Sequence, residues 1–564
     1  MTMTREAMWQ RLEKAAEVDV LVIGGGIVGA GVARDASRRG LSVMVVEMND
    51  LASGTSSRSS KLVHGGLRYL EQYEIGLVFE SVSERRILMD LAPHLVNPLG
   101  FVFPVYQGSR HNLLMIRAGM WLYDGLSLFR SPKRHRQLSA KDVESEEPAL
   151  ETKGLKGAPL YYDCSTDDAR LTLENAIDAC KHGAIVATYA KVESLQKGAG
   201  GRVRSAIVRD LIGGRTKEVR ARAIVNATGP WTDATIALAG GADTKTAPML
   251  RPTKGVHIVV DHARLPVTNA VVCYHPDDGR VLFAIPWGDR TYVGTTDTDY
   301  EGDPADVAAT REDVRYLLRA TTTYFPKQNV SEADVISTWA GLRPLIAEAG
   351  VSESQVSREH SITVSSDGLV TIAGGKLTTY RRMSAEIVDT VVRVLEMSRE
   401  LKKELAPSRT DKDPLPGGEG WPEDDDHAKV AARVREASKS AFDDETSLAL
   451  AGHYGMRALV LAERAAADAS AAARILPNRP ERMVQVDYAI DEEMATTLID
   501  VFLRRTQLFL RDHDQALGAA AAVADRMAAR LGWDEARRAA EISAYEMEVA
   551  RSRRWRSEPA APTS

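Results

Sequence analysis

A glycine-rich turn between two apolar strands constrains this chain more than any other stretch. Residues 19–47 read DVLVIGGGIVGAGVARDASRRGLSVMVVE, with the spacing Gly24-x-Gly26-x-x-Gly29 after one apolar run and Glu47 at the end of the next. Such a turn brings backbone N–H groups at a helix N-terminus to a dinucleotide diphosphate, and an acid about 20 residues further on can hydrogen-bond a ribose hydroxyl. Because both strands and the acid are present, the stretch predicts a dinucleotide site, although the motif alone does not separate FAD from NAD.

Composition bounds the class of protein. A chain of 564 residues is too long for one core and predicts two to four domains. The net charge of −6 argues against a nucleic-acid binder, which is normally basic. The 3 cysteines form no CxxC pair, which fits a reducing compartment and gives no zinc or disulfide framework. No apolar run approaches the roughly 20 residues that span a bilayer, and the charged N-terminus is not a secretory signal.

Metal binding is not predicted. Residues 163–174 imitate a calcium loop, with acids and a serine at several ligand positions. The sixth position, which should be glycine, is Asp168, and the eighth, which should be apolar, is Arg170. The stretch is therefore interpreted as a strand end followed by a helix.

Three later segments suit close approach of backbone to a ligand. They are the polar loop SGTSSRSS at 53–60, the turn NATGPWTD at 226–233 and the junction AGGKLTTYR at 373–381. Each is also typical of an ordinary loop or turn. Together with the first glycine turn they predict a site assembled from four distant segments, which fits an FAD domain interrupted by insertions better than a simple NAD domain.

These motifs resemble flavin-dependent glycerol-3-phosphate dehydrogenases, within the glycine/D-amino-acid oxidase-like flavoproteins. The resemblance covers nearly the whole chain, including LRRTQLFL at 503–510. Its other signature stretches are DVLVIGGGIVGAGVARDASRRG, SSKLVHGGLRYLE, DDARLTLENA, NATGPWTD, KGVHIVV, IPWGDR, GTTDTDYEGDP, GLRPL and GGKLTTYR.

The resemblance and the composition shifts imply a fold of α/β plus α class. We expect a Rossmann-like FAD-binding domain with an interleaved mixed α+β substrate domain, followed by an all-helical C-terminal domain. The expected parts are an N-terminal helix at 1–17, a discontinuous FAD-binding domain at 18–95, 160–250 and 347–400, a substrate domain at 96–159 and 251–346, a linker at 401–427, the helical domain at 428–550, and a basic, disordered tail at 551–564.

The resemblance further implies FAD as cofactor and oxidation of sn-glycerol 3-phosphate to dihydroxyacetone phosphate, with electrons passed to a membrane quinone. It implies a cytoplasmic homodimer bound peripherally to the inner face of the cell membrane. Apolar and basic residues at 121–136 and the stretch RSRRWR at 551–556 are candidate contacts with anionic lipid. For the first of these, composition favours a packed helix followed by a solvated basic loop.

The predicted substrate site is a cluster of cations. Arginine binds phosphate bidentately, and lysine adds a point charge. By resemblance, Arg68, Arg343 and Lys376 line the substrate site, with Tyr69 and His257 beside them. His257 is the best candidate base, because an imidazole with a pKa near 6.5 takes a proton near neutrality. Lys376 could instead stabilise the developing alkoxide or the reduced flavin.

The predicted cofactor set combines the glycine turn with the later segments. Val192 is expected to contact the adenine through its backbone, and His64 to position flavin or substrate. The full set is Gly24, Gly26, Gly29, Glu47, Thr55, Ser56, Ser57, His64, Val192, Gly229, Gly374 and Thr378.

Three alternatives remain open from the sequence. A glycerol-3-phosphate oxidase would pass electrons to oxygen and make peroxide. An amine or amino-acid oxidase would act on an amino acid, against which the three cations argue. A flavin-binding regulatory protein would bind FAD without being reduced by any substrate.

Overall fold

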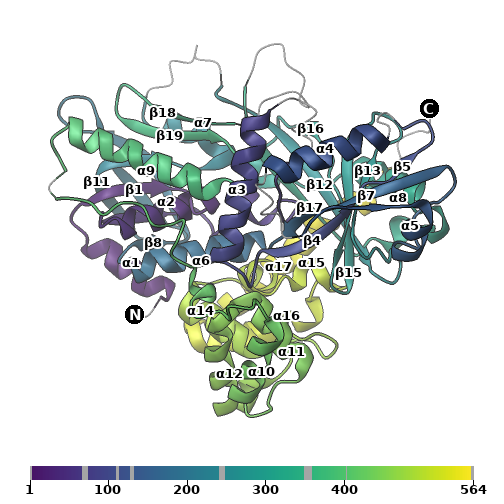
Figure 1. Ribbon diagram of the computed structural model, residues 1–564. Helices are drawn as coiled ribbons and strands as arrows, with labels where there is room; N and C mark the ends of the chain where they lie inside the picture. The colour runs from purple at the N-terminus through teal and green to yellow at the C-terminus, as the bar shows by residue number, and fades with distance from the viewer. Residues whose placement is uncertain are drawn as a thin grey trace.

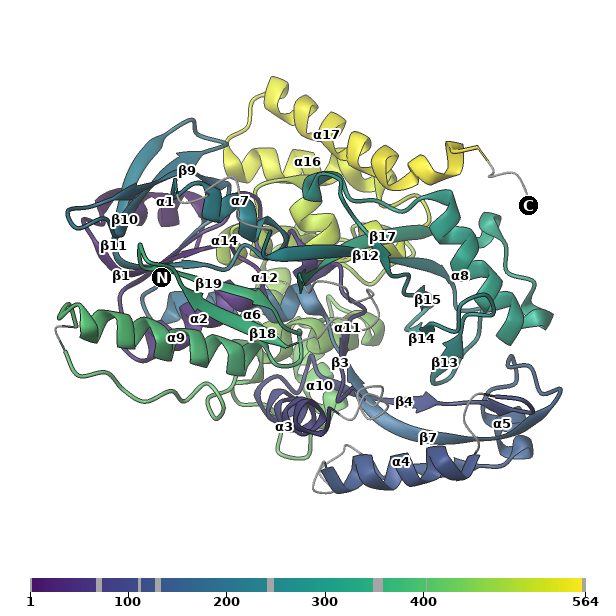
Figure 2. The ribbon, with the colours of Figure 1, turned by 90° about the horizontal axis from the view of Figure 1, so that it is seen from above.

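The computed structural model describes residues 3–66, 74–109, 113–126, 133–240, 248–347, 359–401 and 403–559. Within these ranges the strands form two sheets, and helices that follow residue 426 form a third unit in contact with both (Figures 1 and 2). This is the predicted combination of a Rossmann-like sheet, an interleaved mixed sheet and a helical C-terminal domain.

The first sheet is built on the glycine-turn segment. Its strand order is β18-β19-β11-β1-β2-β8, and β10 and β9 extend β11 as an antiparallel meander. The central pairs are parallel, and strands buried on both faces read as continuous apolar runs such as VLVI and VMVV. The strands are β1 Val18–Ile23, β2 Val43–Val46, β8 Ile185–Ala187, β9 Ala190–Lys197, β10 Val203–Asp210, β11 Thr216–Asn226, β18 His360–Val364 and β19 Leu369–Gly374.

Three helices pack together on this sheet. α2 (Ile27–Arg38) lies between α6 (Asp168–Lys181) and α9 (Tyr380–Met397), as Figure 1 shows. A Cβ added to Gly31 would lie 2.4 Å from Ser384 Oγ, so the glycine lets α2 and α9 approach closely. The N-terminal helix α1 (Arg5–Lys14) contacts β8 at the sheet edge.

The second sheet carries the substrate-domain segments. Its order is β16-β12-β15-β14-β13-β4-β7-β3, with β17 paired to β12, and β5 and β6 paired to β7. The strands are β3 Leu62–Val63, β4 Asn97–Val102, β5 Val105–Tyr106, β6 Arg136–Leu138, β7 Leu155–Ser165, β12 Leu250–Asp261, β13 Ala270–Tyr274, β14 Val281–Trp287, β15 Arg290–Gly294, β16 Thr298–Asp299 and β17 Ser337–Ile346. The helices among them are α3 Ile75–Leu91, α4 Leu113–Leu126, α5 Ala140–Glu146 and α8 Arg311–Tyr324, whereas α7 Thr232–Ala237 contacts β11 and β19 of the first sheet.

The C-terminal unit is helical and touches both sheets. Its longest helix, α17, runs beside β17, as seen from above in Figure 2. Its helices are α10 His427–Ala437, α11 Asp444–Tyr454, α12 Ala458–Ala467, α13 Ala469–Ala472, α14 Met483–Glu493, a π-helical turn at Asp500–Arg505, α15 Leu508–Arg511, α16 Leu517–Leu531 and α17 Glu535–Arg553.

The expected boundaries differ from the structure at three places. The boundary at 160 falls inside β7, which pairs with β4 over residues 160–165 and with β5 and β6 over residues 155–160, and so belongs wholly to the second sheet. The expected linker is packed rather than free, since Arg34 donates hydrogen bonds to the backbone of Thr410 and Asp413 and Leu415 is buried.

The expectation of a disordered tail is wrong for residues 551–559. α17 continues to Arg553, and Trp555 is only 2% exposed in a core cluster beneath the second sheet. Arg554 forms an ion pair with Asp306, and Arg556 donates to the carbonyl of Val335 at 2.6 Å. Composition alone missed this because the aromatic side chain is buried by a distant part of the chain.

Candidate active site

A cavity of about 870 Å³ lies where the two sheets meet. This falls within the range of about 300–1,000 Å³ that small-molecule and cofactor sites occupy. The four predicted segments all reach it, together with the strand ends of β12 and β17. The predicted residues that line it are Gly24, Gly26, Glu47, Thr55, Ser56, His64, Val192, Gly229, His257, Arg343, Gly374, Lys376 and Thr378.

Two predicted residues that the structure describes are not among those lining the cavity. A Cβ on Gly29 would lie 2.0 Å from the carbonyl oxygen of Gly24, so this glycine serves close packing of helix and turn. Ser57 is buried behind the loop, and its carbonyl accepts a hydrogen bond from Lys61 Nζ. Arg68 and Tyr69 lie outside the described residues.

The glycine turn has the geometry that a diphosphate requires. Gly24 has φ +109°, and a Cβ there would lie 2.5 Å from the carbonyl oxygen of Ala227, so only glycine fits. Gly26 is the N-cap of α2, and the N–H of Ile27 donates to Ser56 Oγ at 2.9 Å. The start of α2 therefore presents backbone donors and the loop hydroxyls to one point of the cavity.

Glu47 closes the turn from the next strand. Its Oε2 accepts the N–H of Gly25 at 2.6 Å, and Oε1 accepts that of Asn49 at 2.9 Å. Burial raises the pKa of this carboxyl, which the two backbone bonds oppose. Oε1 also accepts a hydrogen bond from Ser53 Oγ at 3.4 Å, and Oε2 retains a second acceptor position, so the carboxyl can also take a ribose hydroxyl.

The second sheet contributes His257, on β12, to the lining of the cavity. Its Nε2 lies 2.9 Å from Ser60 Oγ, and its ring stacks on Trp339 at 4.5 Å between centroids. Its Nδ1 makes no hydrogen bond with any described residue. Burial, then the charges of Arg343 and Lys61, hold the pKa of His257 well below its ordinary value of about 6.5, so the expectation of an ordinary pKa is wrong.

Arg343 reaches across from β17. Its Nη1 donates to Asp297 Oδ1 at 2.9 Å and its Nη2 to Thr295 Oγ1 at 3.2 Å. A Cβ on Gly255 of the paired strand β12 would lie 2.7 Å from Nη2. Glycine at 255 is thus what leaves room for the guanidinium, whose side chain is 21% exposed.

The third cation, Lys376, follows the end of β19. Gly374 there has φ +73°, and a Cβ would lie 2.5 Å from the carbonyl oxygen of Glu359. Thr378 Oγ1 bonds the backbone of His64 at 3.2 and 3.3 Å, which ties this junction to the loop after β3. Residues 59–66 and 374–378 therefore form one wall of the cavity.

The loop also contains an anchor that was not predicted. Lys61 is buried and forms an ion pair with Asp168 at 2.7 Å, and Ser59 Oγ donates to the same carboxyl at 2.7 Å. The pattern SSK before an apolar pair predicts only a loop. It does not predict the ion pair, because the partner Asp168 stands more than one hundred residues further along the chain.

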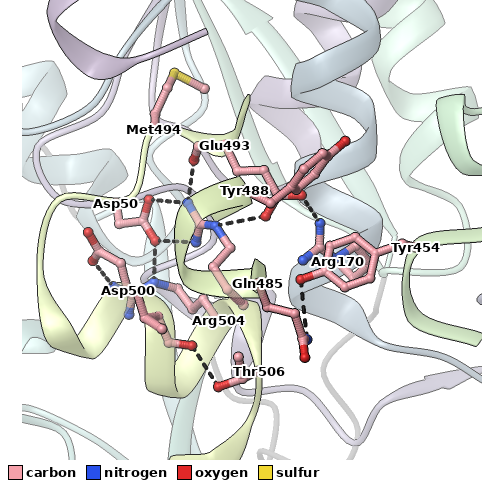
Figure 3. Close-up of polar contacts among 12 residues, drawn as sticks. Asp50, Arg170, Tyr454, Gln485, Tyr488, Glu493, Met494, Asp500, Arg504 and Thr506 are labelled. Atoms are coloured by element: carbon pink, nitrogen blue, oxygen red, sulfur yellow. Dashed lines mark hydrogen bonds and ion pairs between the residues drawn. The ribbon is translucent and has the colours of Figure 1, made fainter. Parts of the chain in front are cut away.

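A buried ion cluster joins the loop at 47–60, which we call the cofactor loop, to the C-terminal domain (Figure 3). Asp50 accepts hydrogen bonds from Arg504 Nε at 2.6 Å and from Arg505 Nη1 and Nη2 at 2.7 and 2.9 Å. We call these three residues the arginine clamp. The two arginine charges hold the pKa of Asp50 below its ordinary value although burial alone would raise it. The arginines belong to the π-helical turn, a conformation often found at functional sites.

Comparison with known proteins identifies the family. The family described as DAO, FAD dependent oxidoreductase, matches residues 19–381, and that described as the C-terminal domain of alpha-glycerophosphate oxidase matches 408–538. The chain is 37% identical over 565 residues to an aerobic glycerol-3-phosphate dehydrogenase of Staphylococcus epidermidis, covering 99% of each chain. The chain belongs to the FAD-dependent glycerol-3-phosphate dehydrogenase family.

A further relative and two solved structures also resemble the chain. An aerobic glycerol-3-phosphate dehydrogenase of Bacillus subtilis is 39% identical over 518 residues, 92% of each chain. The solved glycerol-3-phosphate dehydrogenase from Bacillus halodurans, complexed with FAD, shares the fold with a TM-score of 0.80, 33% identity and 99% coverage of both chains. The L-alpha-glycerophosphate oxidase of Mycoplasma pneumoniae shares the fold with a TM-score of 0.53 at 18% identity, over 71% of this chain and 100% of its own.

FAD, the cofactor of this family, suits the residues present. The Gly24–Gly26 turn and the start of α2 fit a diphosphate, and Glu47 fits a ribose. The wall at 374–378 offers further backbone groups to a cofactor in the cavity. The predictions of fold class, cofactor and family are confirmed.

Proposed function

We propose that this chain oxidises sn-glycerol 3-phosphate to dihydroxyacetone phosphate and passes the electrons to a membrane quinone. The observation that carries the proposal is that Arg343, Lys376 and His257 line the same cavity as the glycine turn and Glu47, with the charge of Arg343 close enough to act on His257. A phosphate monoester needs such cations, and a secondary alcohol needs a proton acceptor beside them. The aerobic dehydrogenases of Staphylococcus epidermidis and Bacillus subtilis carry the same activity in their names.

Each residue has a separate task in this proposal. Arg343 binds the phosphate, with Asp297 fixing the guanidinium from behind. His257, whose Nε2 lies 2.9 Å from Ser60 Oγ and whose imidazole is kept neutral by burial, takes the hydroxyl proton. Lys376 stabilises the alkoxide as the proton leaves. FAD, when bound, accepts the hydride from C2.

Anaerobic titration of the flavin absorbance with glycerol 3-phosphate tests the proposal. We expect bleaching by the wild type, weaker binding in Arg343→Ala, and slower bleaching in His257→Ala. Arg433→Ala, which removes an exposed cation on α10, is the matched control and should behave as the wild type. If dithionite bleaches the flavin and glycerol 3-phosphate does not, the assigned substrate is wrong.

The electron acceptor needs its own test. The alternative is an oxidase, because the matched C-terminal family is described as a domain of alpha-glycerophosphate oxidase. Reoxidation of the reduced flavin by a soluble quinone in the absence of oxygen supports the dehydrogenase. Fast oxygen uptake with stoichiometric peroxide, unaffected by quinone, would replace it with the oxidase.

We further propose that the chain, as a homodimer, binds the inner face of the cell membrane from the cytoplasm through α4. No described helix is long and apolar enough to cross a membrane. On α4, however, Leu114 is 75% and Trp121 64% exposed, and Met115 and Leu122 are exposed beside them. The basic residues Lys133, Arg134 and Arg136 follow this helix and are exposed.

The second candidate contact, at 551–556, is less suited to lipid. Arg551 and Arg554 are engaged by Glu548 and Asp306, and Trp555 is buried.

An apolar stripe beside exposed cations, as on α4, is the arrangement that binds anionic bilayers. Co-sedimentation with anionic liposomes at moderate salt, and its loss at high salt or with neutral lipid, is the expected result.

A further inference from the structure

The loop that caps α2 carries a cation outside the predicted cofactor set. Arg58 lines the cavity and directly follows the turn Thr55–Ser57, whose Ser56 accepts the N–H of Ile27. The backbone N–H of Arg58 donates to the carbonyl of Thr55 at 3.0 Å. Arg58 is therefore fixed two residues beyond the hydroxyl that caps the diphosphate-binding helix.

The backbone of Arg58 is also held against β17. A Cβ on Gly341 would lie 2.6 Å from the carbonyl oxygen of Arg58 and 2.8 Å from its Cβ. Thr55 Oγ1 donates to the carbonyl of Leu342 at 2.7 Å. These contacts join the cofactor loop to the strand that carries Arg343, and they keep the base of the Arg58 side chain in one place.

The guanidinium of Arg58 is not matched by a protein anion. Among the residues that the structure describes, none forms a hydrogen bond or ion pair with its side chain. The nearby cations do have carboxylate partners, since Arg504 pairs with Asp50 and Asp500, and Arg551 pairs with Glu548. Glu548 acts on Arg58 by its charge alone.

This isolation has an electrostatic signature. Burial, then repulsion by Arg551, lowers the pKa of Arg58 to about 10. The side chain still carries its charge at neutral pH, in a place where the charge is disfavoured. An anion brought into the cavity by a ligand would relieve that cost, and a planar guanidinium matches the geometry of phosphate oxygens.

We propose that Arg58 binds a phosphate group of the ligand in this cavity, and that the group is the diphosphate of the cofactor. The diphosphate is favoured because Arg58 follows Ser56, which bonds the start of α2, by two residues, and all three line the cavity. The phosphate monoester of the substrate is the other source, and that source rests on the proposed function.

Titration of the full-length protein, freed of flavin, with FAD, ADP and riboflavin distinguishes the cofactor diphosphate from the substrate phosphate as the group that Arg58 binds. In Arg58→Ala the affinities for FAD and ADP should fall at least about tenfold, while that for riboflavin, which has no phosphate, stays within about twofold. Arg58→Lys should lie between wild type and Arg58→Ala, because it keeps the charge but loses the bidentate geometry. Arg433→Ala, which removes an exposed cation on α10 that is not among the described residues lining the cavity, should change FAD affinity less than about threefold.

Every outcome bears on the proposal. Unchanged FAD affinity together with a weakened affinity for glycerol 3-phosphate and for inorganic phosphate would keep the phosphate site and assign it to the substrate. Equal losses for FAD and riboflavin would mean that Arg58 only supports the loop, and no loss in any arm would overturn the proposal outright. Should Arg58→Ala fail to fold, Arg58→Lys and Arg58→Gln give the same comparison. If the wild type binds FAD through Arg58 but is not reduced by glycerol 3-phosphate, the proposed function fails while this site stands.

Discussion

Replacement of Gly255 by alanine tests how the fold leaves space for Arg343. A Cβ at this position would lie 2.7 Å from Arg343 Nη2 and 2.6 Å from Thr295 Oγ1, closer than real Cβ contacts come. The guanidinium is the far end of a flexible side chain, so we expect it to move out of register with Asp297 rather than the strand to unfold.

The magnitude follows from the bonds at stake. A hydrogen bond to a charged group contributes about 1.5–3 kcal/mol, and loss of one such bond to the phosphate weakens substrate binding about 10- to 150-fold. Overpacking of the site costs a further about 1–3 kcal/mol of folding stability. The first effect is measured by anaerobic flavin titration and the second by thermal unfolding.

A double-mutant cycle isolates the cause. If alanine at 255 acts through Arg343, it should weaken substrate binding no further in an Arg343→Ala background. Additive losses in the double variant would refute the reasoning. Gly452→Ala in α11, where an added Cβ meets nothing within 4 Å, is the control and should leave substrate affinity unchanged.

Three further predictions concern other parts of the molecule. Asp50→Asn should lower the free energy of unfolding by about 3–5 kcal/mol, because it breaks a buried ion cluster, and FAD should dissociate faster from the variant, measured by flavin fluorescence. Because the pKa of His257 is lowered, its imidazole stays neutral as pH falls through about 6.5, so kcat/KM should decline only below that pH. Arg343→Ala removes the second cause of the shift and should move this inflection upward; an unmoved inflection would contradict the assignment. Replacing Leu114 and Trp121 together by serine should reduce co-sedimentation with anionic liposomes without changing flavin reduction, and undiminished binding would exclude α4 as the contact.

The sequence predicts those parts of the site that depend on local order. The run from Gly24 to Glu47 has its strand, turn, helix and acid in one continuous stretch, and the structure has all of them in place. The same local order marks the distant glycine junctions, since Gly229 follows β11 and Gly374 ends β19, and these two strands pair in the first sheet.

What the sequence missed depends on partners far along the chain. Arg58 stands in a serine-rich loop, where a solvated cation is the ordinary interpretation. Only the folded structure shows that Arg58 lines the cavity. Trp555 is buried in a core cluster whose other members lie between residues 102 and 342, so the basic composition of the tail wrongly predicted disorder. The lowered pKa of His257 likewise requires the stacked Trp339 and the charge of Arg343, neither of which is near it in sequence.

The arginine clamp has a consequence for biosynthesis. The loop at 47–60 is made early, but Arg504 and Arg505, which hold its Asp50, are added only when about nine-tenths of the chain has left the ribosome. The loop therefore gains these contacts only after the C-terminal domain has been made, and we expect flavin capture to be one of the last steps of maturation. Chains interrupted before residue 503 lack both arginines and should bind flavin more weakly than the full chain.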